Sequence, residues 1–246
     1  MRNIRMLLQY EGGRYQGWQK QTSTENTIQG KLEILLSKMC QEPIELSGSG
    51  RTDAGVHASG QVANFHTNNS MPVEEMLRYC NNYLPQDIAV IAMEEVAPRF
   101  HSRLNACKKR YSYRVINSEI PNVFWHRYAQ EVPQELDVDA MKKAAEYLLG
   151  EHDFKSFTST KKSKKSTIRR IDSITIERTD TLLTFTFVGN GFLHHMIRII
   201  MGTLLEVGMG MRTPESMQEI LNARTREAAG ALAPAKGLTL EKVFYQ

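Results

Sequence analysis

Residues 48–65 read Gly-Ser-Gly-Arg-Thr-Asp-Ala-Gly-Val-His-Ala-Ser-Gly-Gln-Val-Ala-Asn-Phe, and they are the most informative stretch of the chain. Four glycines surround one arginine and one aspartate, Arg51 and Asp53. Glycine adopts positive φ angles and lets backbones approach closely, so a turn this rich in glycine can present a guanidinium and a carboxylate side by side. The alternation that follows at 61–66 predicts a strand. We therefore expect a loop at a sheet edge that is built for chemistry.

Asp53 has two interpretations. An aspartate in a glycine-rich loop often serves only to form the turn. Arg51, two residues away, favours a functional role, because a neighbouring cation keeps a carboxylate ionised and oriented, and such a carboxylate is a nucleophile or a base. The segment lacks the Gly-Lys-Ser/Thr ending of a phosphate-binding loop, so a nucleotide site of that type is excluded.

Working outward, the first half of the chain predicts the order βαββαβ. A strand is expected at 3–10, a helix at 28–39 behind a capping box at Asn26–Gln29, short strands at 44–46 and 61–66, a second helix from Pro72, and a strand at 87–96. This is the connectivity of ferredoxin-like modules.

The second half repeats that order loosely. Its pattern predicts a strand through 111–115, a helix at 138–148, a hairpin of 171–178 with 182–188, helices at 196–207 and 214–223, and a last strand at 238–245. Residues 118–136 look like an insertion. We expect an α+β protein of two ferredoxin-like (RRM-like) βαββαβ-type subdomains, 1–105 and 106–246, with mainly antiparallel sheets.

Composition narrows the class of protein. The 246 residues are 41% hydrophobic and 24% charged, as in a soluble globular protein. No apolar run approaches the length that crosses a bilayer, and the N-terminus lacks a signal-peptide cleavage region. Three widely spaced cysteines argue against a disulfide framework or a metal knuckle. We expect a cytoplasmic protein without a membrane segment.

The net charge is only +4, but the basic residues are clustered. The first cluster is Lys108, Lys109, Arg110 and Arg114, and the second is Lys161, Lys162, Lys164, Lys165, Arg169 and Arg170. Such runs are either solvated loops or polyanion sites. Aromatic residues beside each run (Tyr111 and Tyr113; Phe154 and Phe157) favour nucleic-acid binding for these lysines and arginines.

A second candidate site lies at 189–198, Gly-Asn-Gly-Phe-Leu-His-His-Met-Ile-Arg. A glycine turn leads into an apolar helix whose first turns are expected to carry His194, His195 and Arg198. Adjacent histidines on a helix point apart, so a shared metal is not expected. An arginine in an apolar run needs an anionic partner, in a structural ion pair or a catalytic one.

Two aromatic residues are also open to two interpretations. Tyr111 follows a basic triplet on a strand, where it either packs in the sheet or stacks on a nucleobase. Trp18 lies in a glycine-containing loop, and we expect it to anchor that loop rather than to contact RNA.

Several ordered motifs together resemble the tRNA pseudouridine synthase A family. They are residues 48–58 (Gly-Ser-Gly-Arg-Thr-Asp-Ala-Gly-Val-His-Ala), 10–19, 82–90, 100–103, 109–114, 189–198 and 233–240. The resemblance implies isomerisation of uridine to pseudouridine at tRNA positions 38, 39 and 40 in the anticodon stem-loop. It also implies that the sheets of the two subdomains flank a central RNA-binding cleft, that a homodimer spans the tRNA, and that no cofactor and no metal take part.

The resemblance assigns roles to four residues. Asp53 aligns with the catalytic aspartate, Tyr111 with the tyrosine under the target base, Arg198 with the arginine paired to that aspartate, and Arg51 with an arginine linked to base extrusion. Whether the aspartate attacks the sugar or removes a sugar proton stays open. Flipping a base out of its stack costs a few kcal/mol, which Arg51 can offset by filling the gap.

The chain departs from the family pattern at two positions. The family commonly has Gly-Leu-Tyr-Leu where this chain has Gly-Leu-Thr-Leu at 237–240, so Thr239 stands in place of the tyrosine. Lys236, immediately before this segment, is the second departure. A specialised paralogue with a different RNA target is therefore one alternative. A non-catalytic RNA-binding module of ferredoxin-like topology is another, although the aromatic RNP strand of such modules is not found. An unrelated aspartate-dependent transferase needs a donor-binding motif that the sequence does not show.

Overall fold

The computed structural model describes residues 1–160 and 166–246. Two compact units make up the chain: Met1–Cys107 with Thr239–Gln246, and Lys108–Leu238. The expected division at 105/106 differs from these units, because the first unit runs to Cys107 and also contains the C-terminal residues. Helices accompany sheets that are mostly antiparallel, so the chain is α+β, as expected.

Within the described residues, none of the helices combines the length and apolarity that crossing a membrane requires.

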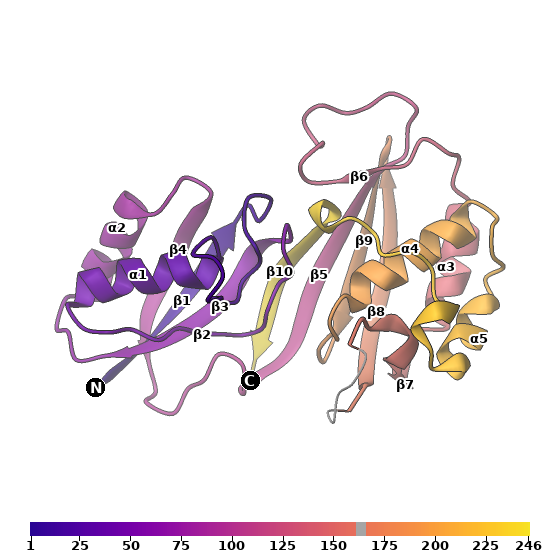
Figure 1. The fold of residues 1–246 in the computed structure, drawn as a ribbon. Coiled ribbons are helices and arrows are strands. Elements are labelled where there is room, and N and C mark those ends of the chain that lie inside the picture. Colours follow the sequence, from indigo (N-terminus) through magenta and orange to yellow (C-terminus); the bar gives the residue numbers. More distant parts are fainter. Residues whose placement is uncertain (161–165) are drawn as a thin grey trace. The chain divides into compact units, whose positions relative to one another are not determined.

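The first unit is a sheet with two helices against one face (Figure 1). Its elements are β1 (Arg2–Tyr10), α1 (Ile28–Cys40), β2 (Ser47–Gly48), β3 (His57–Thr67), α2 (Val73–Tyr83), β4 (Ile88–Val96) and β10 (Leu238–Tyr245). β1 pairs antiparallel with β3 and β4, and β2 pairs antiparallel with β3. β10 runs parallel to β3, with Thr239 opposite His57. The first six elements follow the expected βαββαβ order.

Periodicity explains how these elements pack. Ile4, Met6 and Leu8 alternate along β1 and are fully buried, as a strand with one core face requires. α1 begins at Ile28, as expected, but its N-cap is Thr27 rather than Asn26, the first residue of the expected capping box. The Thr27 hydroxyl accepts a hydrogen bond from Gly30 N at 3.1 Å. The short strand expected at 44–46 lies instead at Ser47–Gly48.

The second unit also places helices against a sheet (Figure 1). Its elements are β5 (Ala106–Ile116), β6 (Gln130–Glu131), α3 (Val138–Glu146), β7 (Gly150–Asp153), η1 (Phe154–Phe157), β8 (Ile168–Thr179), β9 (Leu182–Gly189), α4 (Met196–Gly208), α5 (Ser216–Ala223), η2 (Arg226–Ala228) and η3 (Ala235–Gly237). The antiparallel order is β5-β9-β8-β7, with the short β6 parallel to β5.

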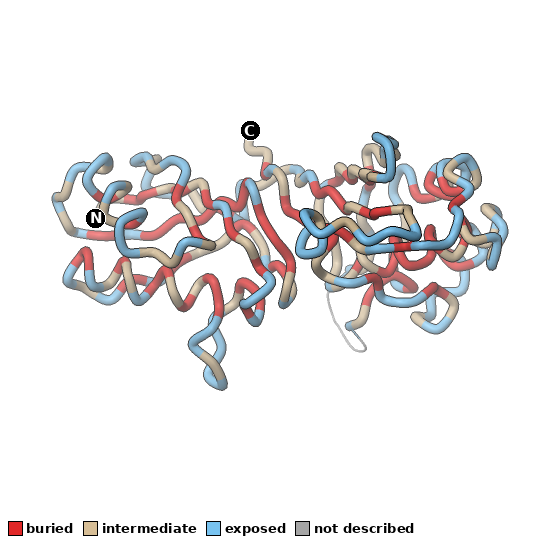
Figure 2. The backbone as a smooth tube through the Cα atoms, turned by 90° about the horizontal axis from the view of Figure 1, so that it is seen from above, coloured by how far each residue is buried: buried red, intermediate tan, exposed pale blue. Residues whose placement is uncertain are grey.

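Aromatic side chains form part of the core of the second unit, beside a larger number of aliphatic ones. Tyr113, Phe185 and Phe187 are fully buried on the strands, and buried residues line the strands and the inner helix faces (Figure 2). Phe154 and Phe157 are fully buried as well. The aromatic residues beside the second basic run are therefore core residues and not surfaces for stacking bases, which corrects one argument for that run.

Gly60 shows how closely β3 and β10 pack. A Cβ at Gly60 would lie 2.0 Å from the carbonyl oxygen of Glu241, a backbone atom that cannot rotate away. Gly60→Ala should therefore lower the free energy of unfolding by about 1–3 kcal/mol, as overpacking does. Urea denaturation tests this, with exposed Ser59→Ala on the same strand as the control. Equal stability of the two variants would contradict the packing argument.

Candidate functional site

The loop Gly48–Val56 is tied to β3 at its start. Ser49 N donates to Val62 O at 2.7 Å. The fully buried Gln61 side chain accepts from Ser49 Oγ at 2.6 Å and donates to Gly50 O at 3.0 Å. Buried polar groups that are satisfied in this way hold one backbone conformation, because leaving them unpaired is costly. The loop therefore leaves the sheet in a defined direction.

Trp18 anchors the loop, as its sequence context predicts. The side chain is 2% exposed and its ring fills the space beside Gly48, where a Cβ would lie 2.6 Å from the ring. The backbone N of Trp18 donates to Thr52 O at 3.0 Å. The Thr52 hydroxyl meets the Tyr10 hydroxyl at 2.9 Å. Burial raises the pKa of Tyr10 to about 12, so its phenol stays protonated in this pair.

Gly17 allows the two loops to touch. It has a φ of +88°, and a Cβ there would lie 2.8 Å from Thr52 O and 3.2 Å from the carbonyl carbon of Asp53. Both the backbone angle and the space exclude a side chain. The motif at 10–19 is therefore a backbone support for the candidate catalytic loop.

Asp87 links that support to the motif at 82–90. Its carboxylate accepts from the Tyr15 hydroxyl at 2.6 Å and from Arg14 Nε at 2.8 Å. Its carbonyl oxygen accepts from Glu11 N at 2.9 Å. Burial by itself raises the pKa of Asp87, but the hydrogen bonds from Tyr15 and Arg14 and the charge of Arg14 outweigh it and leave the pKa below its ordinary value. Tyr15 O in turn accepts from Gly55 N at 3.3 Å.

Asp53 is partly exposed at the outer turn of this loop. Its carbonyl oxygen accepts from Val56 N at 3.1 Å, and Gly55 completes the turn at a φ of +79°. Arg51 is exposed, and its Nε donates to Gln19 Oε1 at 2.9 Å. The hydrogen bond of Arg51 thus goes to Gln19 and not to Asp53, an arrangement different from the side-by-side pair expected from the spacing.

In the second unit, the turn Gly189–Phe192 is clamped to β8. Asn190 N donates to Arg170 O, and Asn190 Oδ1 accepts from Arg170 N, both at 3.0 Å. Phe192, the last residue of this turn, meets Tyr111 edge-on, with the ring centroids 5.3 Å apart and an angle of 83° between the ring planes. Tyr111 is 7% exposed, so Phe192 holds one edge of a ring that β5 carries. Phe192 is therefore a candidate site residue that the sequence alone did not single out.

His194 and His195 precede α4 rather than forming its first turn. His195 is the N-cap residue with a left-handed φ of 65°, and the two rings stack with centroids 3.7 Å apart. The expectation that they point apart on a helix is therefore wrong. His195 Nδ1 lies 2.8 Å from Ser159 Oγ, and His194 O accepts from Ser159 N at 3.3 Å. These contacts hold the entry to the helix.

Arg198 lies in the first turn of α4, partly buried. Its Nε donates to Ala233 O at 2.8 Å. The apolar sequence around Arg198 predicts an anionic partner, and a backbone carbonyl is one partner that the fold supplies. Arg51 and Asp53 thus belong to the first unit and Tyr111 and Arg198 to the second.

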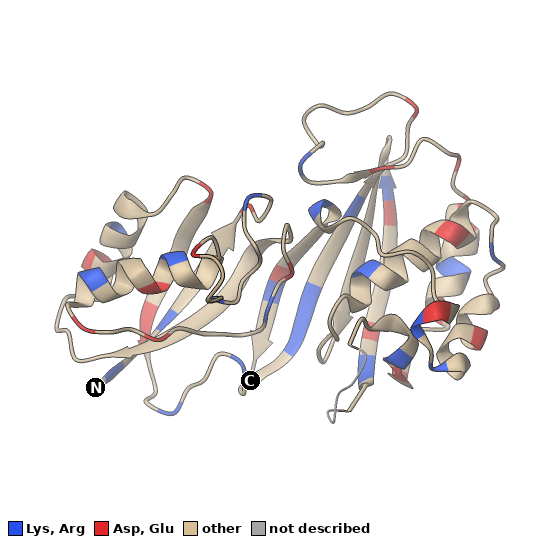
Figure 3. Cartoon of the chain, viewed as in Figure 1, with Lys and Arg blue, Asp and Glu red and all other residues tan. Residues whose placement is uncertain are grey.

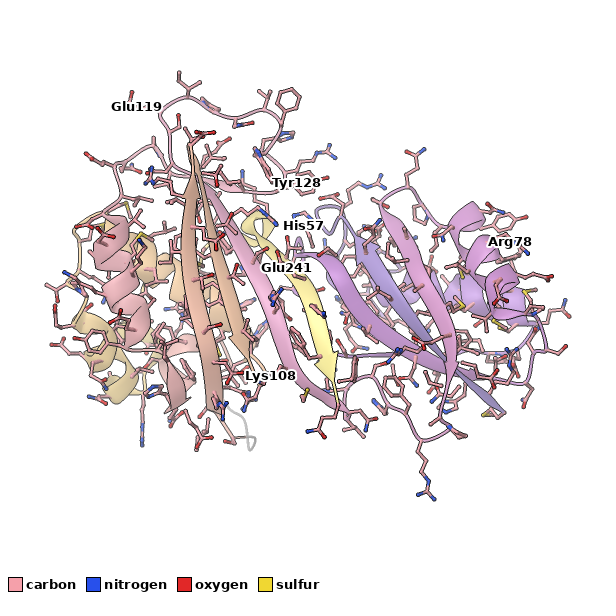
Figure 4. All side chains as sticks on the ribbon, turned by 180° about the vertical axis from the view of Figure 1, so that it is seen from behind. His57, Arg78, Lys108, Glu119, Tyr128 and Glu241 are labelled. Atoms are coloured by element: carbon pink, nitrogen blue, oxygen red, sulfur yellow. The ribbon has the colours of Figure 1, made fainter. Side chains whose placement is uncertain are left out.

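Several of the basic residues proposed to contact RNA already form ion pairs or hydrogen bonds within the protein. Asp172 pairs with Lys108 at 2.9 Å and with Arg170 at 2.7 Å. Arg169 Nη1 donates to the carbonyls of Ser166 and Ile168, and burial lowers its pKa. Basic residues follow β5 (Figure 3), and Lys108 lies near the start of this strand (Figure 4). They include Lys109, Arg110 and Arg114, whereas Lys161, Lys162, Lys164 and Lys165 lie outside the described residues.

The two departures from the family pattern have defined places. Thr239 is 8% exposed and lies opposite His57 on the neighbouring strand. His57 Nδ1 accepts from Gly12 N at 3.0 Å, so this edge of the sheet supports the same loop system. Lys236 Nζ donates to His126 O at 3.0 Å, within the loop between β5 and β6.

Known proteins share this sequence along its length. The family model described as tRNA pseudouridine synthase matches residues 6–105 and 144–246. The chain is similar to tRNA pseudouridine synthase A 1 of Clostridium tetani (48% identity), tRNA pseudouridine synthase A of a Bacillus species (45%) and tRNA pseudouridine synthase A 2 of Bacillus cereus (43%), each over 245 residues and 100% of both chains. A solved Cbf5-Nop10-Gar1 complex aligns with 83% of this chain and 45% of that chain, at 12% identity and a TM-score of 0.41.

The Tyr15–Asp87 hydrogen bond generates a prediction with a pH signature. Tyr15→Phe should lower the free energy of unfolding by about 1–2 kcal/mol at neutral pH, since a bond to a charged group is lost. Because the folded-state pKa of Asp87 is depressed, its contribution is present above the unfolded-state pKa of about 3.9 and is lost as pH falls through the folded value. The difference should therefore shrink in acid.

Denaturant titrations at pH 7 and near pH 3 measure this difference. Tyr83→Phe is the matched control, because Tyr83 is 64% exposed in the same unit. A Tyr15→Phe variant as stable as Tyr83→Phe at pH 7 would rule out a supporting role for the bond.

Proposed function

The chain belongs to the tRNA pseudouridine synthase family, as an isomerase that acts on tRNA, and from that membership we propose that it converts uridines 38, 39 and 40 of the anticodon stem-loop to pseudouridine through Asp53. Membership carries the reaction type. The choice of tRNA positions rests on the resemblance of the motifs. The role of Asp53 rests on one observation in addition: the carboxylate stands on a loop whose backbone is held by buried partners on two sides.

The reaction is an internal exchange of bonds. The bond from N1 of uracil to the sugar C1′ breaks, and a bond from C5 of uracil to C1′ forms. The proton leaves C5 and N1 gains one, so atoms and electrons balance without a second substrate. A carboxylate can serve as a nucleophile at the sugar or as a base toward a sugar proton, and Asp53 suits either route.

The other site residues have complementary tasks in the proposal. Tyr111 holds the face of the flipped uracil, with Phe192 supporting its edge. Arg198 pairs with Asp53 and keeps the carboxylate oriented. Arg51 fills the gap left by the flipped base, which suits a side chain that is exposed and whose Nε donates to Gln19.

Basic side chains supply affinity for the RNA backbone in this proposal. Lys108, Lys109, Arg110, Arg169 and Arg170 would contact phosphates, together with the lysines at 161, 162, 164 and 165. Because Asp172 already pairs with Lys108 and Arg170, phosphates compete with a carboxylate at those two residues. Because phosphate contacts are electrostatic, tRNA binding should weaken as the salt concentration rises.

A specialised paralogue is a second proposal, supported by the departure at Thr239. Relatives carry names that end in A 1 and A 2, so several numbered forms exist among them. If the threonine changes the pocket, the chain acts on other uridines of tRNA with the same Asp53 chemistry.

We further propose a cytoplasmic homodimer. The motif resemblance is the main support, and an apolar surface adds to it. Ile120, Val123 and Phe124 are 78%, 69% and 87% exposed in the loop between β5 and β6, near the labelled Glu119 and Tyr128 in Figure 4. Clustered exposed apolar side chains mark interaction surfaces, and a second copy can cover this one.

Asp53→Ala should retain tRNA affinity within about two-fold and lower the rate of pseudouridine formation by at least about 10⁴-fold, because it removes the reacting group and leaves the binding surface intact. Single-turnover assays on an unmodified tRNA transcript measure the rate, and chemical mapping locates each product.

Asp139→Ala is the control, since that carboxylate is exposed on the second unit and should leave the rate unchanged. Product from Asp53→Ala at the wild-type rate would remove Asp53 from the mechanism. Product at uridines other than 38, 39 and 40 would favour the specialised paralogue. Tight binding by wild-type protein without any product would favour the non-catalytic RNA-binding module.

Phe124→Ser should raise the dimer dissociation constant by about ten-fold or more if this side chain is buried between copies, as central aromatic residues of interfaces are. Sedimentation velocity over a concentration series measures it, with Tyr83→Ser as the exposed control. A wild-type chain that stays monomeric at high concentration would exclude the homodimer.

A further inference from the structure

The segment Ala229–Gly237, here called the strap, runs along α4 before the chain enters β10 (Figure 1). It contains three alanines and one leucine between its two glycines and carries no regular secondary structure before η3. Ala229 and Ala233 are buried, whereas Ala231 and Leu232 are exposed. The strap is therefore fixed by its backbone more than by side-chain burial.

Two side chains of α4 hold the first part of the strap. Thr203 Oγ1 accepts from Gly230 N at 2.9 Å and donates to Ile199 O at 2.9 Å. Glu206 Oε1 accepts from Ala231 N at 3.0 Å. Thr203 is fully buried, so its hydroxyl is the acceptor that satisfies the Gly230 amide away from water.

Direct backbone contact joins the strap to the helix between these bonds. A Cβ at Gly202 would lie 1.8 Å from Ala231 O and 2.8 Å from its carbonyl carbon. The strap backbone can come this close to α4 only because Gly202 has no side chain. The strap consequently has no freedom to move toward α4, and the bonds from Thr203 and Glu206 oppose its moving away.

At its other end the strap binds Arg198 twice. Ala233 N donates to Arg198 O at 3.1 Å, and Arg198 Nε donates to Ala233 O at 2.8 Å. One residue further, Pro234 O lies 2.8 Å from the Tyr113 hydroxyl, and Gly237 lies against the Tyr113 ring. Both sides of Ala233 are thus fixed.

We propose that the strap is a positioning element for Arg198, with Thr203 as the side chain that sets its distance from α4. A guanidinium is planar, so a hydrogen bond from Arg198 Nε to the fixed Ala233 carbonyl restricts rotation of the whole guanidinium group. A carboxylate can then bind the edge formed by Nη1 and Nη2 without first ordering a flexible side chain. This inference rests on the proposed function, in which Arg198 orients Asp53.

Thr203→Val tests the strap with almost no change in volume. It leaves the Gly230 amide without its acceptor and frees the strap to shift. We expect the single-turnover rate constant at saturating tRNA to fall about 10-fold, since small misplacements of positioning groups have large kinetic effects, while the tRNA Kd stays within about two-fold. Thr203→Ser keeps the hydroxyl and should restore the rate.

Ser156→Ala is the matched control. Its hydroxyl is also fully buried and donates to a backbone carbonyl, Ile220 O, at 2.6 Å in the same unit. Rates are compared well below the Tm of all variants. If Thr203→Val is no slower than Ser156→Ala, or if Thr203→Ser does not restore the rate, the positioning role is rejected.

Arg198→Lys separates this inference from the proposed function. Lysine has no Nε, so the strap can no longer orient the cation, and Thr203→Val should add less than about a two-fold effect in that background. A wild-type rate for Arg198→Lys would overturn the role of Arg198 itself. A slow Arg198→Lys whose rate falls by a further full 10-fold on adding Thr203→Val would overturn only the strap.

Discussion

The Thr52 peptide is the point on which the candidate catalytic loop depends. Its carbonyl oxygen accepts from Trp18 N and lies against Gly17, and the Thr52 hydroxyl meets a buried tyrosine, Tyr10. Each partner is itself held, because Trp18 is buried beside Gly48 and Tyr10 belongs to β1. The residue that follows Thr52 is Asp53. A carboxylate that is to react needs this kind of fixed support, because reorganisation at the moment of reaction is what enzymes avoid.

Close backbone contact at glycine recurs in the described part of the chain, and three of these contacts lie beside residues discussed above. Gly17 meets Thr52, Gly60 meets Glu241, and Gly202 meets Ala231, in each case at distances that any Cβ would violate. A backbone contact has no rotamers to order, so it fixes position at lower conformational entropy than a side-chain contact does. The first supports Asp53, the second the sheet beside it and the third the strap at Arg198. The fold thus uses the same kind of contact to support two of the proposed site residues, Asp53 and Arg198.

Local patterns in the sequence predicted much of this fold, and distant contacts account for the rest. The period of two in β1, the helical stripe of α4 and the bounds of β10 depend on neighbouring residues, and they agree with the structure. Three features depend instead on residues distant in the sequence or on a sharp turn of the backbone. They are the burial of Phe154 and Phe157, the hydrogen bond from Arg51 to Gln19, and the stacking of His194 on His195. Periodicity carries no information about these. For the same reason, the motifs located the candidate site residues, whereas Phe192 and the Ala233 carbonyl required the fold.

The place of β10 has a consequence for the order in which the protein is made. The chain leaves the first unit at Cys107, builds the whole second unit and returns at Thr239. On the ribosome, where domains generally fold as they emerge, the second unit can complete its own strands first. Until β10 has been synthesised, the edge of β3 beside Gly60 has no strand to cover it. An uncovered strand edge in a nascent chain is open to wrong pairing, so the sheet next to the Asp53 loop is exposed to misfolding for as long as the second unit is being made.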